Sequence, residues 1–293
     1  MILSARRLSA KPSLLGESPV WDPERQRIYW VDGVSRMIHA LDTLTDEFHH
    51  WEVPSTIGSL ALAGGDGLIV GLADGIYSFD LATGRLEPLY RTDPADSRVR
   101  FNDGKVDRNG RFLCGSMGVF AEARGELIRV SPGGNSQVLA NGIRISNALC
   151  FSPDGSVMYF ADSLDRNIRA YRYVPGDGPL EEARVLVDTN PYNSGPDGAT
   201  VDSDGCIWVA LIQVGKIARF TPEGELDRLI EAPTDMPSCV AFGGPDMATL
   251  YVTTIKDSGT GRAVSRHPAG GHLFAIEGLG ATGIPETRFG HAQ

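Results

Sequence analysis

Short apolar stretches recur along the chain, and turn signals rich in Gly, Asp, Asn or Pro separate them. The turn signals begin at Asp22, Gly64, Asp107, Ser152, Asp202 and Gly243, so they are 41 to 50 residues apart. Further along each unit, segments such as residues 76–80, 168–171 and 217–220 alternate apolar and polar positions, which is the period of a half-buried strand. The pattern therefore predicts one repeated unit of short strands joined by tight turns.

Six such units at this spacing predict an all-β fold, a six-bladed β-propeller with blades of about four antiparallel strands. No segment has the pattern of a long helix. We expect residues 2–8 to supply a strand to the last blade and so close the ring. No linker or shift in composition divides the sequence, so residues 1–293 are predicted to form a single domain.

The repeat also predicts a polar ring around the propeller axis. Five residues before the turn signals stand Glu17, Ser59, Asn102, Asn147, Asp197 and Ser238. The innermost strands of a ring of blades line its channel, so these side chains should gather near one mouth. Two carboxylates there would repel each other, and a divalent cation would compensate them. Ca²⁺, Mg²⁺ and Mn²⁺ suit such oxygen ligands, with Zn²⁺ and Fe²⁺ possible; the alternative is a ring of hydrated polar groups that fills a structural channel.

Composition narrows the classes of partner. The chain is 42% hydrophobic and 22% charged, as in ordinary globular proteins, and its formal net charge is −10. An acidic chain repels phosphate backbones, which argues against nucleic acid as a partner and favours a neutral substrate or a bound cation. The alternative is that the excess of acidic residues only keeps the protein soluble. No apolar run is long enough for a membrane span, and no secretory signal is recognisable, so the cytoplasm is the expected location. The four cysteines form no C-x-x-C pair and are expected to be buried free thiols.

Several shorter motifs are set aside. The segment that begins at Asp202 lacks an EF-hand glutamate, because Gln213 stands at loop position twelve. Cys114 replaces the first glycine of a G-x-S-x-G serine-hydrolase motif. Asp162, at the end of a second strand, is expected either to brace the axial site or to hydrogen-bond a turn.

Five segments then resemble one known family. They are residues 15–21 (LGESPVW), 100–107 (RFNDGKVD), 146–149 (SNAL), 196–199 (PDGA) and 239–244 (CVAFGG). In this order and spacing the chain resembles the regucalcin/gluconolactonase (senescence marker protein-like) family. The resemblance implies a six-bladed propeller lactonase with one divalent metal and a small sugar lactone as substrate. It also implies that Glu17, Asn147 and Asp197 are metal ligands and that Arg100 and Asn102 bind sugar hydroxyls.

The chain departs from the family in one loop. Family members often carry an acidic residue soon after the segment equivalent to residues 115–117, where it helps to bind substrate. Here Val119 and Phe120 occupy that stretch, and Glu122 is the nearest possible replacement. The departure leaves the sugar preference open.

The implied chemistry is hydrolysis of an internal ester. A metal with three protein ligands keeps open positions for the lactone carbonyl and for a water of lowered pKa. Asp197 is predicted to accept the proton of that water. Two alternatives remain open: an ester or phosphoester hydrolase on the same propeller, and a non-catalytic calcium-binding or scaffold propeller. The pair Glu17 and Asp197 on the axis argues against a scaffold.

Overall fold

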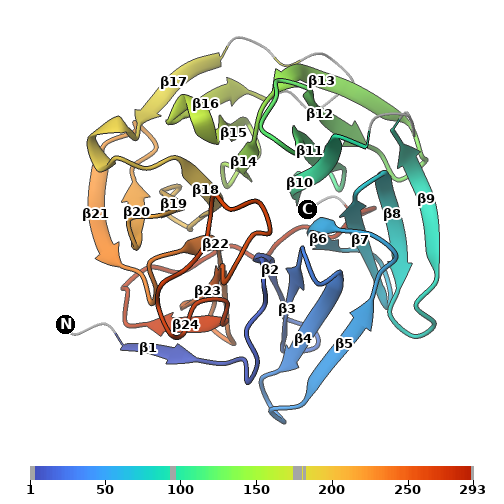
Figure 1. Ribbon diagram of the computed structural model, residues 1–293, viewed down its shortest axis with the longest axis horizontal. Coiled ribbons are helices and arrows are strands. Elements are labelled where there is room, and N and C mark those ends of the chain that lie inside the picture. The colour runs from blue at the N-terminus through green and yellow to red at the C-terminus, as the bar shows by residue number, and fades with distance from the viewer. Residues whose placement is uncertain (1–3, 93–96, 174–179, 181–182, 292–293) are drawn as a thin grey trace.

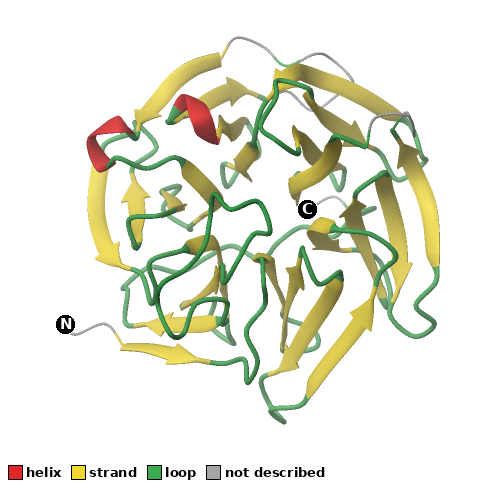
Figure 2. Cartoon of the chain, viewed as in Figure 1, coloured by secondary structure: helices red, strands yellow, loops and turns green. Residues whose placement is uncertain are grey.

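The computed structural model describes residues 4–92, 97–173, 180 and 183–291, and Figure 1 shows six sheets arranged around a central axis. Each sheet has four antiparallel strands, which confirms the predicted six-bladed propeller. Figure 2 shows that strands and loops dominate the described chain, which has only the short 3-10 helices η1 (Ser163–Asp165) and η2 (Asn190–Tyr192). None of the helices in the described ranges is long and apolar enough to cross a membrane.

Each blade runs from an inner strand at the axis to an outer strand at the rim. In this order the first three blades are β2 (Gly16–Asp22), β3 (Arg27–Asp32), β4 (Met37–Asp42) and β5 (Phe48–Glu52); β6 (Ile57–Leu62), β7 (Gly67–Leu72), β8 (Gly75–Asp80) and β9 (Leu86–Arg91); β10 (Val99–Val106), β11 (Phe112–Gly118), β12 (Gly125–Val130) and β13 (Ser136–Ile143). The last three are β14 (Ser146–Phe151), β15 (Val157–Asp162), β16 (Asn167–Arg172) and β17 (Ala183–Asp188); β18 (Pro196–Val201), β19 (Ile207–Leu211), β20 (Lys216–Phe220) and β21 (Leu226–Glu231); β22 (Pro237–Gly243), β23 (Thr249–Thr254), β24 (Phe274–Glu277) and β1 (Ser4–Arg7).

The N-terminal strand closes the ring as expected. β1 pairs antiparallel with β24, from Ser4 opposite Glu277 to Arg7 opposite Phe274. The sixth blade is thus assembled from both ends of the sequence. Ile2 and Leu3, which the prediction included in this strand, lie outside the described residues.

The hydrophobic core is divided among the gaps between neighbouring blades. Strand alternation places apolar side chains on both faces of each sheet, where they pack against the next sheet in separate clusters. Between the sixth and first blades, for example, Trp21 stacks on Tyr251 with ring centroids 5.7 Å apart. All four cysteines are free and buried, as predicted.

The predicted turns lie between the first and second strands of each blade, and an aspartate anchors several of them. Asp202 accepts the backbone N–H of Cys206 at 2.9 Å and the indole N–H of Trp208 at 2.8 Å. It also accepts the Asp204 N–H at 3.0 Å and a bond from the Arg219 guanidinium, whose Nε donates at 2.7 Å. The aspartate therefore acts as the acceptor that stabilises a β-turn, in agreement with the exclusion of an EF-hand.

The C-terminal segment covers the turn side of the ring. Phe289 N–H donates to the carbonyl of Leu62, at the end of an inner strand, at 2.8 Å. Lys105, on the inner strand β10, forms a 3.0 Å ion pair with Glu286. The starts of the inner strands lie at the opposite mouth, which this segment leaves uncovered.

Candidate active site

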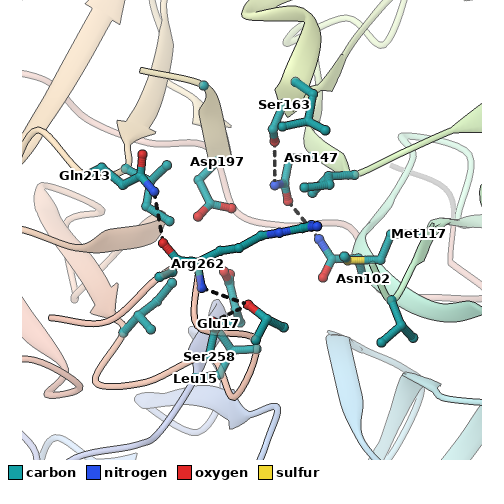
Figure 3. Close-up of a pocket in the computed structure, with 18 of the residues that line it drawn as sticks. Leu15, Glu17, Asn102, Met117, Asn147, Ser163, Asp197, Gln213, Ser258 and Arg262 are labelled. Carbon is teal, nitrogen blue, oxygen red and sulfur yellow. Dashed lines mark hydrogen bonds between the residues drawn. The ribbon is translucent and has the colours of Figure 1, made fainter. Parts of the chain in front are cut away.

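A cavity of about 390 Å³ opens at the mouth where the inner strands begin. All five residues predicted to bind metal or substrate line it, namely Glu17, Arg100, Asn102, Asn147 and Asp197. Figure 3 shows the two carboxylates and the two amides facing one space from different blades. The fold thus brings together side chains that are up to 180 residues apart in the sequence.

The two serines of the predicted ring lie elsewhere. Ser59 and Ser238 are fully buried and are absent from the cavity lining. Ser59 Oγ contacts Cys114 Sγ at 3.3 Å, and Ser238 Oγ donates to the carbonyl of Gly16 at 2.6 Å. These two serines connect neighbouring blades, so only the four larger side chains of the predicted ring line the cavity.

A bulge at the start of each inner strand aims these side chains at the axis. In β2 the pairing register with β3 shifts between Glu17 and Val20, and in β14 the register with β15 shifts between Asn147 and Cys150. A bulge bends a strand locally and redirects a side chain. Ser18 (φ 50°) and Ala148 (φ 52°), the residues after Glu17 and Asn147, have left-handed backbones. Such strain costs about 1–3 kcal/mol per residue and is typical of functional positions.

Glycine is required beside Asp197. A Cβ atom on Gly198 would lie 2.1 Å from the sulfur of Cys239 on β22, far inside contact distance. Because Gly198 has no side chain, β18 can lie close to β22 and bring the Asp197 carboxylate to the axis. The segment that carried part of the family resemblance thus has a packing reason for its glycine.

The two carboxylates are electrostatically destabilised. Burial raises the pKa of Glu17 well above its ordinary value, and the negative charges of Asp197 and Asp103 raise it further. Burial, and then the charge of Asp103, likewise raise the pKa of Asp197, while the Gly198 N–H and Arg100 oppose the increase. Among the described residues, neither Glu17 nor Asp197 has an ion-pair partner within 4 Å. A bound cation would remove this repulsion.

A chain of hydrogen bonds orients the amides. Arg100 Nη1 donates to Asn102 Oδ1 at 2.8 Å, and Asn102 Nδ2 donates to Asn147 Oδ1 at 3.0 Å. Asn147 Nδ2 donates in turn to Ser163 Oγ at 2.8 Å, and this hydroxyl donates to the carbonyl of Pro196 at 2.7 Å. The chain directs the Asn147 oxygen away from Ser163, and an amide oxygen keeps a second lone pair for another partner.

The oxygen donors fit a divalent cation. Across the described ranges, no three His, Cys, Asp or Glu side chains gather as a metal site. A site here would therefore consist of two carboxylates, Glu17 and Asp197, and the amide oxygen of Asn147. Oxygen-only donor sets suit Ca²⁺, Mg²⁺ or Mn²⁺ better than softer metals.

The loop after β11 supplies no acid to the cavity. Val119 lines the cavity, whereas the Phe120 side chain is 69% exposed at its rim. Glu122 is absent from the lining, and its Oε2 accepts the Phe120 N–H at 3.0 Å. Glu122 therefore stabilises its own turn and does not replace the family's acidic residue.

Sequence reasoning missed several polar and charged residues near the cavity, including Arg166, Ser258 and Thr260. Ser163, Gln213 and Arg262 line it, and Asp103 adds negative charge beside it. Asp162, next to Ser163, accepts the Arg144 and Leu164 N–H groups at 2.9 and 3.2 Å, so it hydrogen-bonds a turn. The sequence did contain a signal for the segment that carries Arg262: residues 256–271 lack the strand pattern expected at that point of the repeat, which indicates a long connection.

Comparison with known proteins gives concordant matches. The sequence profile described as "SMP-30/Gluconolactonase/LRE-like region" matches residues 15–256, which include all five predicted site residues but not Arg262. A 6-deoxy-6-sulfogluconolactonase of Pseudomonas putida is 36% identical over 269 residues, which cover 90% of this chain and 91% of that protein. A pentonolactonase of Haloferax volcanii is 35% identical over 282 residues, which cover 94% of each. A solved structure of regucalcin from Agrobacterium tumefaciens, named as a calcium-binding protein, has a TM-score of 0.89 at 27% identity and covers 98% of this chain and 97% of that one.

Proposed function

The chain belongs to the SMP-30/gluconolactonase/LRE-like family, and from this premise we propose that it is a hydrolase that opens a sugar lactone to the aldonic acid with the help of one divalent cation. The observation that carries the proposal is the pair of carboxylates, Glu17 and Asp197, which line one cavity with two amides and have no ion-pair partner among the residues that the structure describes. The names of the relatives support the reaction class, because two of them are lactonases of sugar acids.

The geometry supports a role for each of the five site residues. Glu17, Asn147 and Asp197 would hold the cation, which when bound polarises an ester carbonyl and lowers the pKa of a water molecule. Asp197 is the general base, because its carboxylate lines the cavity and has no ion-pair partner among the described residues. Asn102 Oδ1 can accept from a substrate hydroxyl through its second lone pair, whereas both Nδ2 hydrogens are donated to the Ser146 carbonyl and to Asn147 Oδ1. Arg100 holds the Asn102 amide in place and offers further N–H donors.

The same site favours a polyhydroxylated substrate. Besides the carboxylates and amides, Ser163, Gln213, Ser258 and Thr260 contribute polar groups to the lining. Apolar side chains such as Met117 and Ile145 form the remaining wall, which suits the carbon faces of a sugar ring. We keep Ca²⁺ as the first cation to test and the cytoplasm as the expected location, in accord with four reduced cysteines.

The test is a metal-restored lactonase assay. Protein treated with chelator is mixed with a panel of five- and six-carbon aldonolactones, single cations are added back, and acid release is followed with the spontaneous rate subtracted. We expect turnover that returns with one or more cations. If no aldonolactone is hydrolysed while calorimetry shows a bound cation, the proposal is wrong.

Two variants assign the base. Asp197→Asn keeps the shape of the side chain but cannot accept the proton, so turnover should fall at least a hundredfold, within the range that general base catalysis contributes. Asp246→Asn, in an exposed turn, is the matched control and should leave the rate unchanged. Near-normal turnover of Asp197→Asn with cation bound would contradict the role of Asp197.

A further inference from the structure

A hairpin from the sixth blade covers part of the cavity mouth. It lies in the connection between β23 and β24, and we call residues 257–264 the cap hairpin, because Asp257 and Val264 pair as an antiparallel bridge. Its base is fixed, since the backbone N–H groups of Lys256 and Asp257 both donate to the carbonyl of Leu14 at 2.9 Å. Residues 258, 260, 262 and 263 of the cap hairpin line the cavity.

Arg262, at the tip of the cap hairpin, reaches across the cavity. Gln213 Nε2 donates to the Arg262 carbonyl at 3.1 Å, and Arg262 Nη2 donates to the carbonyl of Phe120 at 2.7 Å. Figure 3 shows the side chain extended across the view, between Asp197 and Glu17. A contact from the fifth blade therefore holds the backbone of Arg262, and a contact from the third blade holds its guanidinium at the cavity.

The positive charge of Arg262 has no carboxylate partner. The charged residues of the cavity lining are Arg100, Arg166, Arg262, Glu17 and Asp197. Arg166 Nη1 donates to the neutral Asn193 Oδ1 at 3.2 Å, and Arg262 donates to a neutral carbonyl. Within the part of the chain that the structure describes, neither arginine has a carboxylate oxygen within 4 Å. A protein of net charge −10 thus lines one cavity with three arginines and two carboxylates, and among the described residues two of these arginines form no ion pair.

We propose that Arg262, assisted by Arg166, binds an anionic substituent of the substrate, so that the preferred lactones carry a negatively charged group on the carbon remote from the ring carbonyl. A guanidinium presents five N–H donors in a planar fork that matches phosphate, sulfonate or carboxylate oxygens, and the bond to Phe120 uses only one nitrogen. A neutral lactone would need no charge there. This inference rests on the proposed lactonase function and names the substrate class of the same cavity.

The test compares a neutral and an anionic lactone. The probes are D-glucono-δ-lactone and its 6-phosphate ester, assayed with the cation that restores activity, and the quantity is the ratio of kcat/KM for the ester to kcat/KM for the neutral lactone. We expect wild type to favour the phosphorylated lactone. Arg262→Gln should lower the ratio by about tenfold or more, because it removes hydrogen bonds between the charged guanidinium and the charged phosphate. Arg262→Lys should recover only part of it, since a lysine lacks the fork.

A matched control and a second readout separate the explanations. Arg266→Gln removes the same charge from an exposed residue beyond the cap hairpin that does not line the cavity, and it should keep the wild-type ratio. Competitive inhibition gives the second readout: 6-phosphogluconate should inhibit more strongly than gluconate in wild type, and Arg262→Gln should remove the difference. An unchanged ratio in Arg262→Gln, or a wild type that does not distinguish the two lactones, overturns the inference and leaves the lactonase proposal standing. If wild type hydrolyses no lactone at all, both are wrong.

Discussion

The Asn147 amide is held by the hydroxyl of Ser163, whose Oγ accepts from Asn147 Nδ2 at 2.8 Å. Ser163 is able to accept because its own proton is donated to the carbonyl of Pro196, one residue before Asp197. Together with Asn102, whose Nδ2 donates to Asn147 Oδ1, Ser163 thus fixes which end of Asn147 faces the axis. It also ties that amide to the strand of the fifth blade that carries Asp197. Partners of this kind commonly decide how well a metal ligand is oriented.

Ser163→Ala should therefore weaken cation binding. Without the hydroxyl the Asn147 amide keeps only its bond from Asn102 Nδ2 and is held less firmly, so we expect a loss of roughly 10-fold in cation affinity. Isothermal titration with Ca²⁺ measures it directly. Ser258→Ala is the control, since Ser258 lines the same cavity but contacts only Thr260 Oγ1 through its hydroxyl. Equal affinities in the two variants would mean that Ser163 does not orient the ligand.

The sequence predicted the cavity residues on the inner strands and missed those in the connections between strands, for a physical reason. Glu17, Asn102, Asn147 and Asp197 occupy equivalent positions of the repeat, so counting residues was enough to bring them to one axis. Ser163 and Arg262 lie in connections between strands, where the repeat sets no position. The equivalent position in the repeat did not bring Ser59 to the cavity, because its short hydroxyl packs against Cys114 between strands. That residues 1–293 form one domain stays a prediction.

Removing one axial carboxylate should stabilise the cation-free protein. Burial and the nearby charges of Asp197 and Asp103 disfavour ionised Glu17, so the neutral amide of Glu17→Gln relieves repulsion. We expect its free energy of unfolding at pH 7.5 in chelator to rise by roughly 1–2 kcal/mol. Added Ca²⁺ should raise the melting temperature of wild type but not that of the variant. Urea unfolding and thermal scans check both, with Glu87→Gln, an exposed residue, as control. A destabilised Glu17→Gln in chelator would contradict this account.

The buried pair Asp202 and Arg219 predicts the opposite behaviour, a loss of stability without a change at the site. Arg219 Nε lies 2.7 Å from Asp202, and the two side chains are 8% and 0% exposed. Arg219→Met leaves the carboxylate buried without its cation, which typically costs about 3–5 kcal/mol. Urea unfolding measures the loss, and the Ca²⁺ affinity of the folded variant should match wild type. Arg85→Gln, which breaks an exposed pair with Glu87, should cost less than about 1 kcal/mol.

Asp103 should make the cation-free protein less stable as the pH rises. It is half-buried on β10 and accepts the Leu149 N–H at 2.8 Å, and burial raises its pKa to about 6. An unfolded aspartate titrates near pH 3.9, so between about pH 4 and pH 6 the folded state holds a proton that the unfolded state has released. The contribution of protonated Asp103 to the free energy of unfolding is therefore fully present below about pH 4, and it is lost as the pH rises through about 6.

Asp103→Asn removes this titration and should abolish that part of the pH dependence. Between pH 4.5 and pH 7.5 in chelator, the free energy of unfolding of wild type should fall by about 1–2 kcal/mol more than that of the variant. This is less than the full pKa difference would give, because Asp103 is only half-buried and solvent screens its charge. Urea unfolding at the two pH values measures both losses, and Asp246→Asn, in an exposed turn, should behave like wild type. Parallel losses in wild type and Asp103→Asn would show that other carboxylates carry the pH dependence.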